Sequence, residues 1–258
     1  MVKRLEVVAL LLVTTLCYSP SAAVAQQSTM TAMQPVVIER AETLDKGKVA
    51  IDAGLALETD REFAGVEYDN MRLAPLGVRF GLNSGIEIGA NLALSSNDAN
   101  QSGAPNKSGL EGISLFGKLK LNQSSTLRVG LVAAGDNDIA PYPNDGIDIF
   151  ANLAVQKPID AGLLYGELGY KAQGGDFDVN NYFNYGVGLA VPVAETIGLN
   201  LELVGEQAQE IGVSNTLDLV FGANLLFGDA IRLAPYVSFG VNDASPDVAT
   251  GALLELRI

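Results

Sequence analysis

The sequence predicts an all-β fold, a transmembrane antiparallel up-and-down β-barrel of about 12 strands. Two observations support this prediction. Nearly every segment from Lys48 to Ile258 alternates apolar and polar residues, which places one set of side chains on each face of a sheet. The connections between these segments also alternate, short and then long. Barrels of the bacterial outer membrane have this asymmetry, with tight periplasmic turns at one end and longer outer loops at the other.

The N-terminus has the features of a secretory signal peptide. Lys3 and Arg4 form a basic start, an apolar run follows, and Ala23-Val24-Ala25 matches a cleavage site. The apolar run is too short for a membrane-spanning helix. The only cysteine, Cys17, lies in this segment, so the mature chain has no thiol. We therefore expect three parts, which are a signal peptide (1–25), an irregular periplasmic lead-in (26–47) and the barrel (48–258).

The strands differ in how clearly they alternate. In one of the clearest, Ile86, Ile88 and Ala90 stand on one face, and Glu87 and Gly89 on the other. The remaining strands of the predicted set follow the same scheme less cleanly. The clearest six lie at residues 49–57, 86–94, 113–121, 147–155, 197–203 and 217–227.

The connections distinguish a barrel from other β-folds. The long ones are rich in Asp, Asn, Gly, Ser and Pro, which are typical of loops. A soluble β-sandwich would also alternate, but it has no reason to sort loop length by strand parity. The short connections are residues 83–84, 122–125, 157–160, 192–196 and 228–229. The long connections are residues 59–70, 95–109, 135–145, 172–181, 208–214 and 241–248.

Composition agrees with a barrel in lipid. The chain is 48% hydrophobic with a mean hydropathy of +0.23, yet its formal net charge is −14. A barrel accommodates both properties, because apolar residues contact outer-membrane lipid while charges occupy the lumen and loops. A pI near 4.3 argues against nucleic acid as a partner, since phosphate binding needs a basic face.

Residues near both ends of the predicted barrel resemble a bacterial outer-membrane family named for the phenol-degradation meta-pathway, a group of transporter-like proteins. The similar segments are residues 43–48, the hairpin at 215–240 and the following stretch 240–247. The chain departs from such barrels at its end, because Ile258 replaces the usual terminal aromatic residue. The resemblance implies an outer-membrane barrel that passes small, apolar or aromatic compounds.

The sequence contains no histidine, which excludes Ser-His-Asp and Cys-His catalysis and histidine-bound zinc. A mechanism using only carboxylates stays formally open, but we expect no enzyme, no catalytic residue, no bound metal and no cofactor. The Asp-rich segments 136–138 and 176–178 offer oxygen ligands of the kind calcium takes. Solvated outer loops are the simpler interpretation.

Charged residues on the predicted inner face form the candidate selectivity site. If the barrel closes in sequence order, its basic and acidic members lie on opposing walls and sort solutes by charge. Alternatively, the charges pair across the lumen and plug it, since roughly eight strands already fill their interior with side chains. The set comprises Arg79, Lys118, Lys120, Arg128, Asp148, Glu167, Glu202, Glu206 and Asp218.

These features predict an outer-membrane channel for the passive passage of small molecules. Two alternatives stay open. One is a sealed structural or adhesive barrel, which direct pairing of Lys118, Lys120 and Arg128 with opposing acids would favour. The other is a soluble periplasmic β-protein that binds an apolar ligand in its interior. The solute and the oligomeric state are not predicted.

Overall fold

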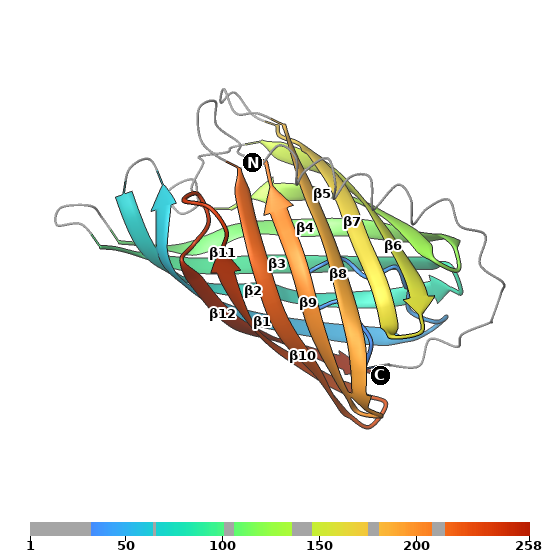
Figure 1. Ribbon diagram of the computed structural model, residues 1–258. Coiled ribbons are helices and arrows are strands. Elements are labelled where there is room, and N and C mark those ends of the chain that lie inside the picture. The colour runs from blue at the N-terminus through green and yellow to red at the C-terminus, as the bar shows by residue number, and fades with distance from the viewer. Residues whose placement is uncertain (1–31, 64–65, 101–105, 136–145, 175–180, 208–214) are drawn as a thin grey trace.

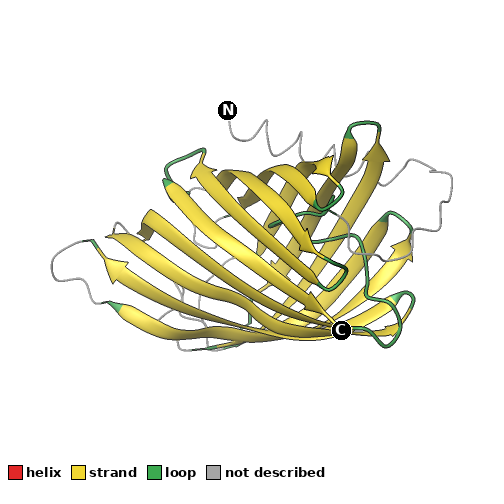
Figure 2. Ribbon diagram, turned by 90° about the horizontal axis from the view of Figure 1, so that it is seen from below, coloured by secondary structure: helices red, strands yellow, loops and turns green. Residues whose placement is uncertain are grey.

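The computed structural model describes residues 32–63, 66–100, 106–135, 146–174, 181–207 and 215–258. In this part of the chain, twelve strands form one closed barrel (Figures 1 and 2). The strands are β1 Val49–Phe63, β2 Val66–Asn83, β3 Ile86–Ala99, β4 Lys107–Asn122, β5 Ser125–Ala134, β6 Ile147–Ile159, β7 Gly162–Ala172, β8 Tyr182–Ala194, β9 Ile197–Glu206, β10 Thr216–Phe227, β11 Ile231–Gly240 and β12 Val248–Arg257.

Each strand pairs antiparallel with its neighbours in the sequence, and β12 closes the barrel on β1. The closing ladder runs from Ala50 opposite Arg257 to Thr59 opposite Val248. The terminal Ile258 adds two backbone hydrogen bonds to Val49 (2.9 and 3.0 Å). The predicted fold class is therefore confirmed. No helix in the described residues is long and apolar enough to span a bilayer.

The two faces of the wall differ as the period-two pattern predicts. Large apolar side chains stand exposed on the outside, such as Leu115 (60% exposed), Ile147 (61%) and Ile149 (58%). Charged side chains on the inside are buried, and Glu87 and Glu202 are completely so. An antiparallel sheet closed on itself in this way leaves no unpaired edge.

The two ends of the barrel also differ. At one end, here called the turn side, the five connections that follow even-numbered strands are two or three residues long, as at residues 84–85 and 228–230. At the other end, the loop side, most connections are longer. Residues 59–70 are an exception, because most of them form strands where the sequence predicts a loop. Instead β1 and β2 continue their ladder to Phe63 opposite Val66, so that the first hairpin is long and its connection short.

The described part of the lead-in, residues 32–47, has no regular secondary structure and lies inside the barrel, bound to inner-face acids such as Glu202 and Glu87. We use "lead-in" below for these residues. Half of these residues are buried, including Val36, Ile38 and Leu44. The predicted signal peptide and the Asp-rich segments 136–138 and 176–178 lie outside the described residues.

Candidate functional site

The lead-in crosses the lumen on the turn side, and both of its ends lie near the turns. At its start, the carbonyl of Ala32 packs so closely on Gly198 that a Cβ there would lie 2.1 Å from the oxygen. At its end, the amide of Gly47 donates to the carbonyl of Gly81 (2.8 Å), and β1 follows. Between these points Ile38 packs on Leu163 and Tyr165 of the wall. Both ends of the described lead-in therefore lie at the same mouth of the barrel.

One wall carboxylate accepts three consecutive backbone amides of the lead-in. Glu202 Oε1 accepts from the amide of Val36 (2.6 Å), and Oε2 accepts from those of Val37 (3.0 Å) and Ile38 (3.2 Å). The hydroxyl of Tyr165 also donates to Glu202 Oε1 (2.8 Å). A buried carboxylate needs such donors, because an unpaired charge is costly in a low dielectric. Glu202 therefore fixes the path of the lead-in through backbone contacts, which do not depend on the identity of the side chains.

Two further carboxylates extend this arrangement along the lead-in. Glu167 Oε2 accepts from the amide of Glu39 (2.9 Å), and Glu87 Oε2 accepts from that of Leu44 (2.8 Å). These acids come from β7 and β3, so the lead-in is bound to walls on different sides of the lumen.

The carbonyls of the lead-in are bound as well. Asn200 and Asn224 both donate from Nδ2 to the carbonyl of Gln34 (2.6 and 2.7 Å). Arg232 donates from Nη2 to the carbonyl of Pro35. The wall thus supplies acceptors for amides and donors for carbonyls, which is how an extended chain is bound through its backbone.

Glu39 forms the central ion pair of the site. Its Oε1 lies 2.6 Å from Nζ of Lys118, and its Oε2 lies 2.7 Å from Nη1 of Arg128. The Arg128 guanidinium also lies over the ring of Phe116, 3.8 Å from its centre. Burial alone would raise the pKa of Glu39, but the two cations outweigh that effect and hold the pKa well below its usual value.

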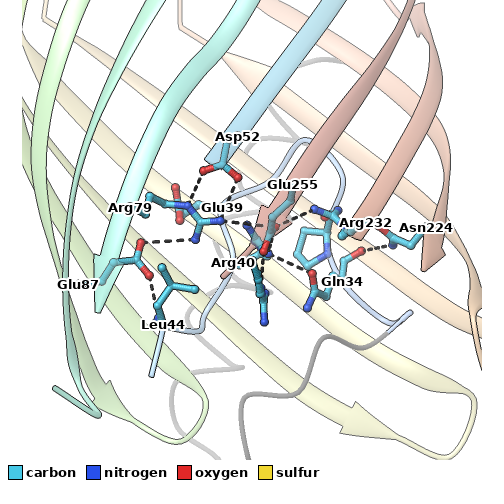
Figure 3. Close-up of polar contacts among 12 residues, drawn as sticks. Gln34, Glu39, Arg40, Leu44, Asp52, Arg79, Glu87, Asn224, Arg232 and Glu255 are labelled. Atoms are coloured by element: carbon cyan, nitrogen blue, oxygen red, sulfur yellow. Dashed lines mark hydrogen bonds and ion pairs between the residues drawn. The ribbon is translucent and has the colours of Figure 1, made fainter. Parts of the chain in front are cut away.

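A second charged cluster surrounds Glu255 on β12 (Figure 3). The carboxylate lies within ion-pair distance of four arginines, of which only Arg40 belongs to the lead-in. Arg79 bridges this cluster to Asp52 (2.6 Å) and Glu87 (3.5 Å). The four distances to Glu255 are 2.5 Å for Arg40, 3.4 Å for Arg79, 3.7 Å for Arg232 and 2.5 Å for Arg257.

The predicted selectivity residues do not form one site. Arg79, Lys118, Arg128, Glu167 and Glu202 lie on the turn side, where each is bound as described above. Lys118 and Arg128 are direct cross-strand partners, but the acid that joins them comes from the lead-in and not from the opposite wall.

The other four predicted residues have different contacts. Asp148 pairs with Lys171 (2.7 Å) on the neighbouring strand. The other three are placed by their backbones. Glu206 donates its amide to the Thr216 hydroxyl (3.2 Å), Asp218 lies opposite Gly240, and Lys120 donates its amide to the Gly85 carbonyl at a turn (2.7 Å).

Sequence reasoning missed Glu39, Arg40 and Glu255. Glu255 stands on the inner face of the last strand, and strict alternation through residues 248–257 would have found it. Glu39 and Arg40 lie in a stretch without period-two alternation, so no pattern pointed to them. Among the described residues, no group of three or more potential metal ligands gathers.

Comparisons with known proteins agree with the fold. No sequence family matches, and no curated protein matches. The translocator domain of the autotransporter NalP from Neisseria meningitidis is 15% identical with a TM-score of 0.53, over 83% of this chain and 90% of that one.

Two other solved structures have a similar coverage. The β domain of the Bordetella autotransporter BrkA is 12% identical with a TM-score of 0.52, over 81% and 98% of the two chains. The KdgM porin is 11% identical with a TM-score of 0.48, over 80% and 98%. Membership of the phenol-degradation family is not confirmed, and what the autotransporter domains share with this chain is the fold of a closed antiparallel β-barrel.

Proposed function

We propose that this protein is an outer-membrane channel for the passive passage of small molecules, closed on the turn side by its own lead-in. In this proposal the lead-in leaves its position to open the pore, while the barrel wall stays intact. The wall residues that bind the lead-in then line the pore and set its selectivity.

The outer surface supports a place in a membrane. Exposed large apolar side chains occur on the outer face of strands all around the barrel, for example Leu55, Leu131, Leu201 and Leu254. In water such a surface would be unfavourable, whereas lipid solvates it and the closed ladder satisfies the backbone. A soluble periplasmic β-protein with an apolar interior would have the opposite distribution.

The observation that carries the channel proposal is that the lumen holds a polypeptide segment. Barrels of roughly eight strands fill their interior with side chains from the wall, whereas larger ones leave space. Here the lead-in occupies that space, from Ala32 near one wall to Gly47 at β1. A cross-section that admits an extended peptide also admits a small solute once the peptide has moved.

The bonds that hold the lead-in favour reversible closure. They include many hydrogen bonds and ion pairs, as for Glu202, Glu167 and Lys118. Water can replace such contacts, at a net cost of about 1.5–3 kcal/mol for each hydrogen bond to a charged group. Apolar side chains of the lead-in pack against the wall as well, with Ile38 on Leu163 and Tyr165. The number of polar contacts is also what a permanently sealed barrel would have, so sealing is the second candidate.

A translocator like the autotransporter domains is less well supported. A barrel that passes a chain needs that chain to run from one mouth to the other. The lead-in instead has Ala32 and Gly47 both close to turns at the same mouth. The finer expectation that the solutes are apolar or aromatic rests on the family resemblance alone.

A reversible disulfide tests whether the lead-in must move. Val36 lies against Gly222 of β10, with its Cβ 3.4 Å from where a Cβ on Gly222 would stand. This separation is close to that of a disulfide, about 3.5–4.5 Å between Cβ atoms. The variant V36C/G222C, expressed from Gln26, has no other cysteine. Planar-bilayer conductance is measured with the oxidised protein and again after reduction with dithiothreitol.

We expect the oxidised protein to be silent and the reduced protein to conduct in discrete steps. The single variants V36C and G222C, which form no internal disulfide, serve as matched controls. Their conductance should not change on addition of dithiothreitol. Inserted barrels that stay silent in every state would refute the channel and favour the sealed barrel. Equal conductance in both states would refute closure by the lead-in.

A further inference from the structure

We propose that Lys118 and Arg128 form a carboxylate-binding site in the lumen, which Glu39 occupies in the closed barrel and small organic carboxylates occupy when the lead-in has moved. This inference rests on the proposed channel function and names a solute class for it. Glu39 is then a tethered occupant of a site that also serves solutes.

The geometry of the occupied site matches a carboxylate. Each oxygen of Glu39 contacts a different cation, Oε1 to Lys118 (2.6 Å) and Oε2 to Arg128 (2.7 Å). Two donors on two side chains therefore bind the two oxygens of one planar group. A single-atom anion such as chloride has one centre in place of the two oxygens that this arrangement matches.

The site is built before its occupant arrives. Lys118 and Arg128 face each other across the β4–β5 ladder, so the sheet sets their spacing. The ring of Phe116 lies under the guanidinium, and Gly89 leaves the space that this ring fills, since a Cβ there would lie 2.4 Å from it. The cations are thus positioned by the wall and not by Glu39.

The site also has donors that Glu39 does not use. Nε of Arg128 is buried and has no hydrogen-bond partner within the described residues. Nζ of Lys118 is a three-donor group, and its side chain is only 2% exposed. Spare buried donors next to a carboxylate point to a ligand that brings more acceptors than one glutamate side chain.

Removing Glu39 would leave two adjacent cations whose ion pairs, within the described residues, go to Glu39 alone. Glu255 differs, because it keeps Arg79 and Arg232 from the wall when Arg40 leaves. Like charges side by side in a low dielectric need an anion. In an open lumen, an anionic solute is therefore expected to bind most favourably at the Lys118–Arg128 site.

The test is direct binding of acetate to the refolded full-length mature chain in detergent. Binding is measured as the line broadening of ¹³C-acetate in NMR spectra. The variant E39A vacates the site, and we expect it to bind acetate at least tenfold more tightly than the wild type. E42A removes a neighbouring acid of the lead-in and should behave as the wild type does. Acetamide has the shape of acetate without its charge and should not bind E39A.

Adding K118Q and R128Q to E39A should abolish the binding, whereas adding K120Q, on the same strand, should not. Heat-modifiable gel migration confirms that each variant is folded, and the acetate–acetamide comparison on E39A holds even if the triple variant does not fold. Equal binding to E39A and wild type, equal binding of acetamide, or displacement of acetate by equimolar chloride would each overturn the proposal. No conductance is measured here, so a failure leaves the channel proposal to be decided by the disulfide experiment.

Discussion

The two halves of the lumen handle their charges differently. On the loop side, charges bind from strand to strand: Arg72 pairs with Glu111 (2.7 Å) and Asp148 with Lys171 (2.7 Å). On the turn side, wall charges also pair from strand to strand, as Arg79 does with Asp52, but several of them bind in addition a segment that is not part of the wall. Glu202 is an example, because it accepts three amides from the lead-in.

This difference shows where the barrel can change without unfolding. Breaking Arg72–Glu111 disturbs only wall residues, and the exposed arginine (46%) is already solvated. Removing a partner on the turn side instead weakens the binding of the lead-in, which is not part of the strand ladder. Local opening is therefore expected on the turn side and not on the loop side.

The largest effect should follow from Glu202→Ala. This change removes the acceptor of three backbone amides and of the Tyr165 hydroxyl. We expect it to lower the local stability of the lead-in by about 3 kcal/mol, and so to increase its opening by roughly 100-fold. An arginine-specific protease measures opening as the rate of cleavage after Arg40. An unchanged rate in a folded E202A barrel would show that Glu202 does not hold the lead-in.

A smaller effect is expected for Glu39→Gln. The amide keeps the shape of the side chain but loses its charge pairing with Lys118 and Arg128. Partial exposure of Glu39 weakens that pairing, so we expect a loss of about 2 kcal/mol and roughly 30-fold faster cleavage after Arg40. Glu42→Gln in the same segment is the matched control. Equal rates for the two variants would mean that the charge of Glu39 is not involved.

Glu111→Gln tests the other half of the lumen. The Arg72–Glu111 pair is partly exposed, and such pairs contribute about 1 kcal/mol or less. Cleavage after Arg40 should change by less than about twofold, because this pair has no contact with the lead-in in the structure. A rate as high as that of E39Q would show that the two halves are coupled.

The smallest effect is expected from mild acid. The pKa of Glu39 is held below its usual value of 4.5, so its contribution to stability is fully present above that value. The contribution is lost only as the pH falls through the lower pKa of the folded state. Channel recordings should therefore show no added opening that depends on Glu39 between pH 7 and pH 5. A difference between wild type and E39Q that shrinks within that range would contradict this assignment.

Much of the wall could be predicted from the sequence, because alternation and loop length are local properties. The segment 59–70 misled the prediction for a physical reason. It forms a long hairpin at the loop side, and its residues are as polar as those of a loop. Polarity marks contact with water, and here it does not mark the end of a strand.

The position of the lead-in could not be predicted in the same way. Its main contacts are between backbone amides and acids far away in the chain, such as Val36 with Glu202, 166 residues apart. Backbone groups are the same in every residue, so they leave no mark in the sequence. Of the predicted selectivity residues, Lys118 and Arg128 do face the lumen, but their partner Glu39 lies in a segment that no periodicity singles out.

The short connection between the lead-in and β1 affects how easily a free solute can displace Glu39 from its site. Only residues 45–48 separate Leu44 from the first strand, and the amide of Gly47 is bonded to Gly81. The carboxylate of Glu39, which residues 40–48 tether to β1, therefore has an effective concentration on the order of millimolar at Lys118 and Arg128. If the barrel is the channel proposed above, a free solute at micromolar levels would seldom displace Glu39, and opening would require solutes that accumulate to higher concentrations.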